Sequence, residues 1–324
     1  MIRKVHLDFH TRPEVRGVGA AFDPDAFART LAGARVNALA TPGKCQYGLT
    51  YFDTRLGRPH PGLVRPDLFP ATVRACTAQG IRVQAYFTLG LDDKVVGRTG
   101  FCIHPRGPLR RVPKVGGTKT VDVAKIRKLG PTHLVVNVDE NPRPVVEELA
   151  EFVPHVIVTH PIEPEDNLGL YRLLGGIFDR EARSEELCQA FADELAATRA
   201  AAESLPREQV LYLIWKSPWM TVARDTYISR MLSLVGWDTV PEHAHSRYPS
   251  VDLTPQRMAG VRHVLLSTEP YSFRDRHIEE LRKELPLQCH PVVSLIDGGM
   301  TSWYGSRAIE GMRYLREFRA AVSG

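Results

Sequence analysis

Five short segments of this 324-residue chain are rich in aromatic, charged or metal-ligating side chains, and nearly all follow an apolar run typical of a β-strand. They are FCIHP (101–105), NVDEN (137–141), IWKSPWMT (214–221), STEPYSF (267–273) and DGGMTSWYGSR (297–307). In an open α/β fold the carboxyl ends of the strands share one edge of the sheet, where ligands bind. We therefore expect these segments to line one cleft.

The aromatic side chains of these segments suit a large, flat ligand. Such rings offer apolar area and stacking faces at low entropic cost. The residues expected to contact a ligand are Trp215, Trp219, Tyr271, Trp303 and Tyr304. The alternative for the tryptophans is packing in a core, and it is strongest for Trp215, which continues an apolar strand.

Three charged residues add polar contacts to this set. Arg307 stands at the expected start of the last helix and could form paired hydrogen bonds with a carboxylate or phosphate, although a surface helix charge fits equally well. Glu140 and Glu269 stand at strand ends, where each could neutralise an amide or a metal. The alternative is that each glutamate is a solvated loop residue.

Cys102 and His104 are candidate metal ligands. They lie two residues apart in an extended loop, where alternation places both side chains on the same side. Thiolate and imidazole both bind transition metals. Two ligands do not complete a site, so the alternative is packing beside a hydrogen-bonded histidine. The chain has no Walker loop, GxSxG elbow or HExxH helix, and no covalently bound cofactor is expected.

Composition excludes several classes of protein. Hydrophobic residues make up 43% and charged residues 24% of the chain, which is typical of globular domains. The net charge of +5 is scattered, so nucleic acid is not an expected partner. The five cysteines contain no CxxC pair, which favours reduced thiols. No apolar run reaches the roughly 20 residues of a membrane span, and the first residues lack a signal peptide's apolar core. A cytoplasmic monomer is the expectation from the sequence as written.

The apolar pattern predicts alternating strands and helices. Strands are expected at 5–9, 35–40 and 82–87 with helices at 23–34 and 65–80, which indicates parallel βα units. Two more strands are expected at 133–138 and 155–160. Helical spacing then runs from 166 to 204, with a break at Gly175–Gly176 and a longer helix at 181–203. After Pro206 the alternation resumes, with strands at 209–215, 262–268 and 291–296 and helices at 225–235, 275–285 and 306–321.

Residues 89–320 resemble the substrate-binding proteins of metal-chelate ABC importers, the group that includes the vitamin B12 and ferric-siderophore receptors. The resemblance lies in LGLDDKVVGRTGFCIHP, VGGTKTVDVAKIRKLGPTHLVVNVDEN, LYLIWKSPWMTVARDTYISRMLSLVGW, LLSTEPYSF and DGGMTSWYGSR, which follow the family's order. It implies a class III periplasmic-binding-protein fold, with two α/β lobes joined by a long backbone helix. The implied divisions are a lobe at 89–165, the helix at 166–205 and a lobe at 206–324.

The same resemblance implies a function. The ligand would be cobalamin, haem, a siderophore or another metal chelate, trapped between the lobes, and the partner would be an ABC permease whose arginines could pair with Glu140 and Glu269. Members of the family work in the periplasm or at the cell surface, and the chain would not be an enzyme.

Residues 1–88 resemble a different family, the opening βα units of an α-L-fucosidase-like glycoside hydrolase barrel. HLDFHT (6–11), NALATPGKCQYGLTYFDT (37–54) and GIRVQAYFTLG (80–90) carry this resemblance. It implies a partial barrel-like segment joined to the binding lobes near Leu89 to Asp93, by natural fusion or by a spliced gene model. A carbohydrate-active enzyme is therefore the alternative function, and a remnant with a damaged first lobe is a second alternative.

Overall fold

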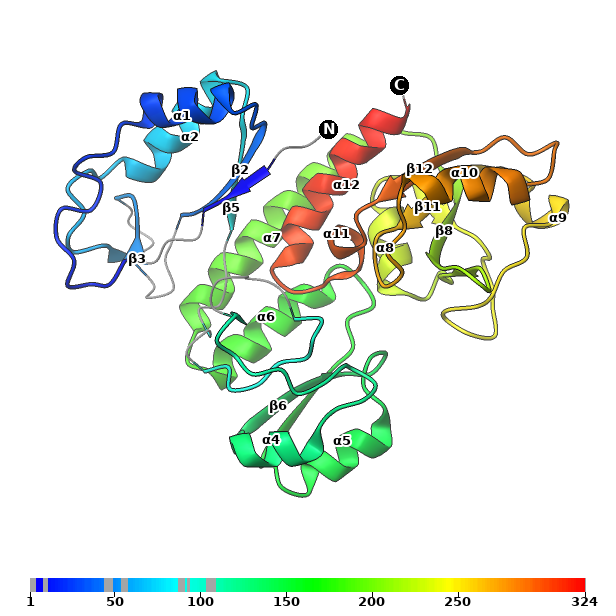
Figure 1. The fold of residues 1–324 in the computed structure, drawn as a ribbon, viewed down its shortest axis with the longest axis horizontal. Helices are drawn as coiled ribbons and strands as arrows, with labels where there is room; N and C mark the ends of the chain where they lie inside the picture. Colours follow the sequence, from blue (N-terminus) through cyan, green and yellow to red (C-terminus); the bar gives the residue numbers. More distant parts are fainter. Residues whose placement is uncertain are drawn as a thin grey trace. The chain divides into compact units, whose positions relative to one another are not determined.

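The computed structural model describes residues 4–7, 11–43, 49–53, 58–86, 91, 94–102 and 109–323. The chain divides into two compact units, Met1–Thr159 and His160–Gly324. Figure 1 shows the ribbon of both units. The finer division at residues 88, 165 and 205 stays a prediction.

The first part of the N-terminal unit is a parallel sheet with its connecting helices. Strands β1 (Lys4–His6), β2 (Ala38–Pro42) and β5 (Arg82–Tyr86) pair in the order β1-β2-β5. Helices α1 (Pro24–Gly33) and α2 (Leu68–Ala78) connect them and pack against each other. The short strands β3 (Leu49–Thr50) and β4 (Arg58–Pro59) pair within the long connection that precedes α2. The expected parallel βα units are thus confirmed.

Helix α1 begins where the sequence predicts it. The Asp23 side chain accepts hydrogen bonds from the backbone N–H groups of Asp25 and Ala26, and Pro24 opens the first turn. The buried residues that join the two helices to the sheet are Ala28, Leu31, Leu39, Ala75, Cys76 and Ile81.

The second part of the N-terminal unit is a smaller α/β layer. Strands β6 (His133–Asn137) and β7 (His155–Thr159) pair in parallel, and helices α4 (Val123–Leu129) and α5 (Arg143–Ala150) accompany them. Its core holds Val115, Ile126 and Leu149. Among the described residues β5 pairs with β2 and β6 pairs with β7, so β5 belongs to the first sheet rather than to this layer.

The C-terminal unit begins with two helices instead of one continuous helix. Helix α6 (Asp166–Ile177) and helix α7 (Glu181–Ala202) pack against each other. The expected break between two helices is confirmed, but it lies at 178–180, because Gly175 and Gly176 still belong to α6. Asp179, in the break, has a φ of 55°. A Cβ on Gly175 would lie 2.6 Å from the Ser184 side chain, so the absence of a side chain permits the close packing.

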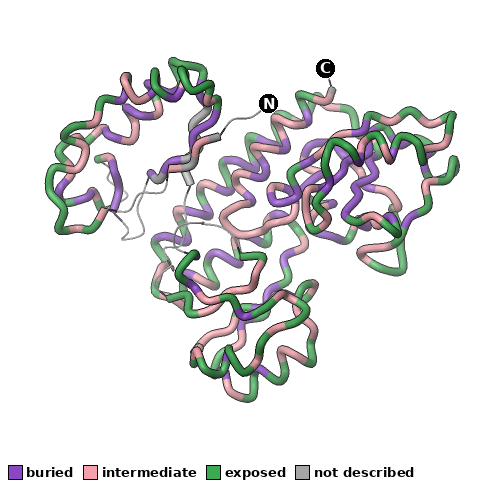
Figure 2. Tube along the Cα trace, in the orientation of Figure 1, coloured by how far each residue is buried: buried purple, intermediate pink, exposed green. Residues whose placement is uncertain are grey.

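A parallel sheet forms the centre of the C-terminal unit. Its order is β10 (Trp237–Thr239), β8 (Glu208–Trp215), β11 (Val261–Ser267) and β12 (Val292–Ile296), and the short β9 (Met220–Thr221) pairs antiparallel with β8. The helices around it are α8 (Tyr227–Ser233), α9 (Pro255–Met258), α10 (Asp275–Glu284), α11 (Gly298–Ser302) and α12 (Arg307–Ser323). Strands β8 and β11 are buried almost throughout, as expected for parallel strands covered on both faces. Figure 2 shows this concentration of buried residues.

A buried ionic cluster, formed by Glu208, His263 and Arg319, links β8 and β11 to α12. One Glu208 carboxylate oxygen lies 3.0 Å from His263 Nε2 and 2.6 Å from Arg319 Nη1. Burial lowers the pKa of His263 despite the adjacent carboxylate. Burial alone would raise the pKa of Glu208, but hydrogen bonds and charge from His263 and Arg319 outweigh it, and that pKa lies below its ordinary value.

No helix in the described part of the chain is both long and apolar enough to cross a membrane.

Candidate functional site

The carboxyl ends of β8, β11 and β12 form the edge that carries most of the expected site residues. The segments that follow these strands are hydrogen-bonded to one another. Gly298 N donates to Thr268 Oγ1 at 3.0 Å, and Tyr271 N donates to the Ile214 carbonyl at 3.3 Å. The structure therefore brings together the three C-terminal segments among the five that the sequence singled out. We call this region the C-terminal edge, defined by residues 215–216, 268–271 and 297–307.

Glycine is required at the centre of the C-terminal edge. A Cβ on Gly298 would lie 2.4 Å from Ser267 Oγ and 2.7 Å from Glu269 N, closer than atoms can approach. The Asp297 side chain accepts a hydrogen bond from Met300 N and so begins helix α11 directly after β12. The turn from β12 into α11 is thus held tightly against the end of β11.

Glu269, Trp303 and Arg307 form one connected group on the C-terminal edge. The Trp303 indole Nε1 donates to Glu269 Oε2 at 2.8 Å. The Arg307 guanidinium carbon lies 5.6 Å from the centre of the Trp303 ring, and Arg307 Nε donates to the Gly299 carbonyl at 3.3 Å. All three side chains are half-buried. A ligand at this edge would meet an aromatic ring, an anion and a cation within a small area.

Trp215 and Tyr271 form a second aromatic contact of the C-terminal edge. Their rings meet edge to face at 5.4 Å between centroids, and 42% of Trp215 is exposed. The sequence predicted Trp215 as a ligand contact but left burial in the core as the alternative, because the residue continues an apolar strand. The strand ends at this residue, so its ring passes beyond the core.

Trp219 is placed differently from the other expected contacts. Its indole Nε1 donates to Glu284 Oε2 at 2.7 Å, and its ring stacks on Phe273 at 6.0 Å. Only 9% of the residue is exposed. This placement favours the packing role for Trp219 over ligand contact. The alternation of side chains in residues 214–221 could not reveal that Trp219 is buried, because the chain reverses after β8 to form β9.

Tyr304 is directed toward the helices of the C-terminal unit. Its half-buried ring meets Tyr227 of α8 edge to face at 6.1 Å. The next residue is tied to α6, since Gly305 N donates to Asn167 Oδ1 at 2.6 Å and the Gly305 carbonyl accepts from Tyr171 OH at 2.8 Å. Tyr304 thus lies at the rim of the edge.

A hydroxyl network beneath the edge was missed by the sequence analysis. Tyr212 OH donates to Ser267 Oγ at 2.9 Å and is joined to Thr301 Oγ1 at 2.6 Å. Ser267 Oγ in turn donates to the Glu269 carbonyl at 2.6 Å. Burial raises the pKa of Tyr212 to about 12, so the phenol keeps its proton. The only signal in the sequence was a tyrosine inside the apolar run QVLYLIW.

In the N-terminal unit, Glu140 stands at the carboxyl end of β6. Its side chain is exposed and accepts a hydrogen bond from Thr118 Oγ1 at 3.1 Å. Asn141 Nδ2 donates to the Thr118 carbonyl at 3.0 Å, which ties the NVDEN and GGTK segments together. Glu140 is therefore held at an exposed strand end, and its role in contacting a ligand or a permease stays a prediction.

The expected metal pair is described only in part. Cys102 is exposed, and its sulfur lies 3.3 Å from Thr99 Oγ1. His104 lies outside the described residues. Within the ranges that the structure describes, no group of three or more His, Cys, Asp or Glu side chains is arranged to hold a metal ion. The pairing of Cys102 with His104 stays a prediction.

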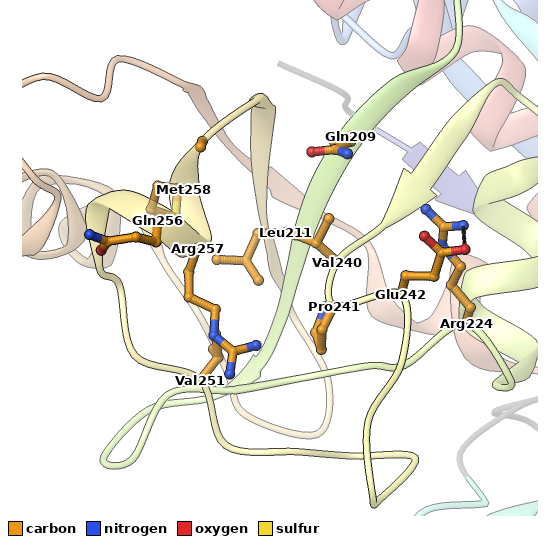
Figure 3. A pocket seen from close by; sticks show the side chains of 11 residues that line it. Gln209, Leu211, Arg224, Val240, Pro241, Glu242, Val251, Gln256, Arg257 and Met258 are labelled. Carbon is orange, nitrogen blue, oxygen red and sulfur yellow. Dashed lines mark ion pairs between the residues drawn. The ribbon is translucent and has the colours of Figure 1, made fainter.

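A pocket of about 260 Å³ lies elsewhere in the C-terminal unit. Figure 3 shows its lining, which includes Gln209, Leu211, Val240 and Arg257, with an ion pair between Arg224 and Glu242 at 3.0 Å. These residues come from the amino-terminal half of β8, the segment between β9 and α8, the segment after β10, and α9. The pocket shares none of the residues expected from the sequence to contact a ligand.

Comparison with known proteins identifies the family. The family model described as "Periplasmic binding protein" matches residues 80–255, more than half of the chain. This chain belongs to the periplasmic binding protein family. The match begins at residue 80, so the barrel-like resemblance of residues 1–88 stays a prediction. The family is one of substrate-binding proteins rather than enzymes.

Curated relatives of this periplasmic binding protein include two from Vibrio. The vitamin B12-binding protein of Vibrio vulnificus (strain CMCP6) is 22% identical over 167 residues, which is 52% of this chain and 61% of the relative. The protein of the same name from Vibrio parahaemolyticus is 22% identical over 169 residues, 52% of this chain and 60% of the relative. The chain thus spans about three-fifths of the length of these relatives.

Solved structures show the fold of this periplasmic binding protein. The periplasmic vitamin B12 binding protein of Vibrio cholerae superposes with a TM-score of 0.63 at 16% identity, over 72% of this chain and 91% of that one. The periplasmic heme-binding protein of Roseiflexus sp. RS-1 gives a TM-score of 0.64 at 19% identity, over 73% and 93%. The fold is therefore the class III periplasmic-binding-protein type that the sequence implies.

Proposed function

We propose that this protein binds a metal chelate of the cobalamin, haem or siderophore type at the C-terminal edge and delivers it to an ABC importer. The observation that carries the proposal is the grouping of exposed Trp215 with Tyr271, and of Trp303 with Glu269 and Arg307, at the carboxyl ends of parallel strands. That is where open α/β folds bind ligands. Relatives whose names give vitamin B12 or heme as ligand support the choice of class.

Within this proposal each residue has a role. Trp215, Tyr271, Trp303 and Tyr304 provide apolar area, and Arg307 provides hydrogen-bond donors. The glutamates Glu140 and Glu269 offer carboxylates at strand ends, either to the ligand or to arginines of a permease. Cys102 and His104 remain proposed ligands for the chelated metal. The bound chelate is cargo, and the protein acts as a monomer without a resident cofactor.

The place of action is also part of the proposal. The family takes its name from the periplasm, and delivery to an importer requires the binding protein to meet its permease outside the cytoplasm. The cytoplasmic location expected from the sequence as written stays the alternative. Fractionation of the native host, with immunodetection of the protein, decides between them.

A titration tests the binding. Cyanocobalamin, hemin and a ferric hydroxamate are each added to the purified protein, and binding is measured by isothermal calorimetry and by tryptophan fluorescence. We expect one member of the panel to bind with micromolar affinity or better. Trp215→Ala should weaken that binding about tenfold or more, because an exposed ring loses its contact with the ligand. Trp219→Phe is the matched control and should leave the affinity within about twofold. Absence of binding by every chelate would overturn the proposal.

A further inference from the structure

The pocket shown in Figure 3 combines buried apolar side chains with exposed polar ones. Leu211 of β8, Val251, and Met258 of α9 are between 1% and 7% exposed, and we call these three residues the apolar floor. Gln209 and Arg257 are exposed and line the same volume of about 260 Å³. In small-molecule sites apolar area supplies most of the contact, and a few polar groups fix the orientation of the ligand. This pocket offers both kinds of group.

Arg257 gives the pocket a positive charge without a counter-charge. Arg224 and Glu242, which also line the pocket, pair with each other at 3.0 Å, and Figure 3 shows this pair apart from Arg257. Among the residues that the structure describes, no carboxylate oxygen lies within 4.0 Å of a side-chain nitrogen of Arg257. The charge of the lining is therefore positive on balance, which favours an anion. A guanidinium suits a carboxylate in particular, because it binds both oxygens through parallel hydrogen bonds.

Gln209 adds a neutral hydrogen-bonding group on the strand side of the pocket. Its carboxamide forms no hydrogen bond with the part of the chain that the structure describes. A Cβ on Gly260 would lie 2.9 Å from Gln209 Oε1, and Gly260 has a φ of 80°. Glycine at this position therefore lets the carboxamide lie beside the end of α9, the helix that carries Arg257. The amide nitrogen can donate to a ligand oxygen in the pocket.

The size of the pocket limits its occupant. A volume of about 260 Å³ is just below the roughly 300–1,000 Å³ of pockets that hold drug-sized ligands. It suits a compact acid and leaves no room for a macrocyclic chelate. The pocket also shares no residue with the C-terminal edge, because Gln209 and Leu211 lie in the first half of β8, whereas Trp215 ends that strand.

We infer that this pocket binds a small organic acid, with the carboxylate at Arg257 and an apolar body against the apolar floor. The inference goes beyond the proposed function and does not depend on it, since the residues proposed to contact a chelate are not involved. Binding of an acid and binding of a chelate are therefore tested separately, and either can fail alone.

A comparison of acids with their neutral amides tests the inference. The full chain is titrated with 4-methylpentanoate, benzoate, the two corresponding primary amides, and acetate. Binding is followed by the backbone amide shifts of Leu211, Val251 and Met258 in ¹H–¹⁵N spectra. We expect at least one of the two larger acids to bind with a Kd of about 1 mM or lower. Its amide should bind about tenfold more weakly, because the charge-assisted hydrogen bonds are lost, and acetate should bind about tenfold more weakly because it lacks the apolar body.

Two variants locate the binding in this pocket. Arg257→Gln should weaken the acid about tenfold and remove its advantage over the amide. Arg262→Gln is the matched control, because it removes the same charge from an exposed side chain that does not line the pocket, and it should leave both affinities within about twofold. Ala259→Phe places a ring at an exposed position of the lining and should abolish the shifts. A thermal unfolding midpoint close to that of the unaltered protein would show that each variant is folded.

Three results would overturn the inference. The first is that neither larger acid shifts the three amides at millimolar concentration. The second is that the neutral amides bind as tightly as the acids, which would leave no role for the charge of Arg257. The third is that a folded Arg257→Gln variant binds the acid with unchanged affinity. In each case the proposal that the C-terminal edge binds a metal chelate would still stand.

Discussion

Tyr212 joins the ends of β11 and α11 through its hydroxyl group. Its bonds to Ser267 and Thr301 are buried, and Ser267 continues the network to the Glu269 backbone. Single side chains below the surface therefore set the position of the residues that we expect to meet the ligand.

Replacing Tyr212 with Phe should lower the free energy of unfolding by about 1–2 kcal/mol, because buried hydrogen bonds contribute about 0.5–1.5 kcal/mol each. It should also shift the indole N–H resonance of Trp303, whose partner Glu269 loses its support. Urea denaturation and ¹H–¹⁵N spectra measure the two effects. Tyr271→Phe removes a hydroxyl group from the edge without disturbing this network and serves as the control. An unshifted Trp303 resonance would show that the network does not position Glu269.

The two tryptophans of the IWKSPWMT segment show why site residues are harder to predict than strands. An apolar run fixes β8, but whether a ring lies inside or outside depends on where the strand ends and how the chain reverses. Trp215 lies past that end and is exposed, whereas Trp219 turns back onto Phe273. The partners of Trp303 and Trp219, Glu269 and Glu284, are 34 and 65 residues distant, so no local pattern could reveal them.

Helices and strands followed the sequence closely wherever periodicity was strong. The expected helix at 181–203 is α7 at Glu181–Ala202, and the expected strand at 262–268 is β11 at Val261–Ser267. Helix α11 was missed because it has five residues and two glycines, too few for a helical period. Its formation depends on the Asp297 cap and on packing against α12 and α8.

The packing of α6 against α7 predicts that Gly175 and Gly176 respond differently to substitution with alanine. Gly175→Ala should destabilise the protein by about 1–3 kcal/mol, because the new methyl group would meet Ser184 at 2.6 Å. Gly176→Ala meets nothing within 4 Å and should stabilise the helix by about 0.5–1 kcal/mol. Urea denaturation of both variants measures the difference. Equal effects at the two positions would contradict the close approach.

The buried ionic cluster predicts how stability depends on pH. Because the pKa of His263 in the folded protein lies below its ordinary value of 6.5, the unfolded chain takes up a proton that the folded protein does not. The free energy of unfolding is therefore unaffected by His263 above pH 6.5, and it decreases as the pH falls below 6.5. The pKa of Glu208 in the folded protein lies below its ordinary value of 4.5, so the free energy of unfolding decreases further as the pH falls below 4.5.

His263→Gln should therefore flatten the fall in stability between pH 7 and pH 5, measured by urea denaturation at each pH. His243→Gln is the control, because the His243 side chain is 94% exposed. A slope that persists in His263→Gln would assign the dependence on pH to other groups.

The division of the whole molecule into two compact units leads to a further prediction. Residues 160–324 contain the complete sheet of β10, β8, β11 and β12 together with its core of Leu211, Leu213, Val264, Leu266 and other residues. We expect this segment, expressed alone, to unfold cooperatively in urea. All four tryptophans of the chain lie in it, so the change in fluorescence should match that of the full chain. A gradual transition would mean that the unit needs the residues before it.

Every residue of the C-terminal edge comes from one stretch of about 90 consecutive positions, 215–307, inside that unit. A gene rearrangement that exchanged the residues before position 160 would thus leave every residue of the C-terminal edge unaltered. The proposed ligand contacts of this edge would then stay together when joined to a new N-terminal partner.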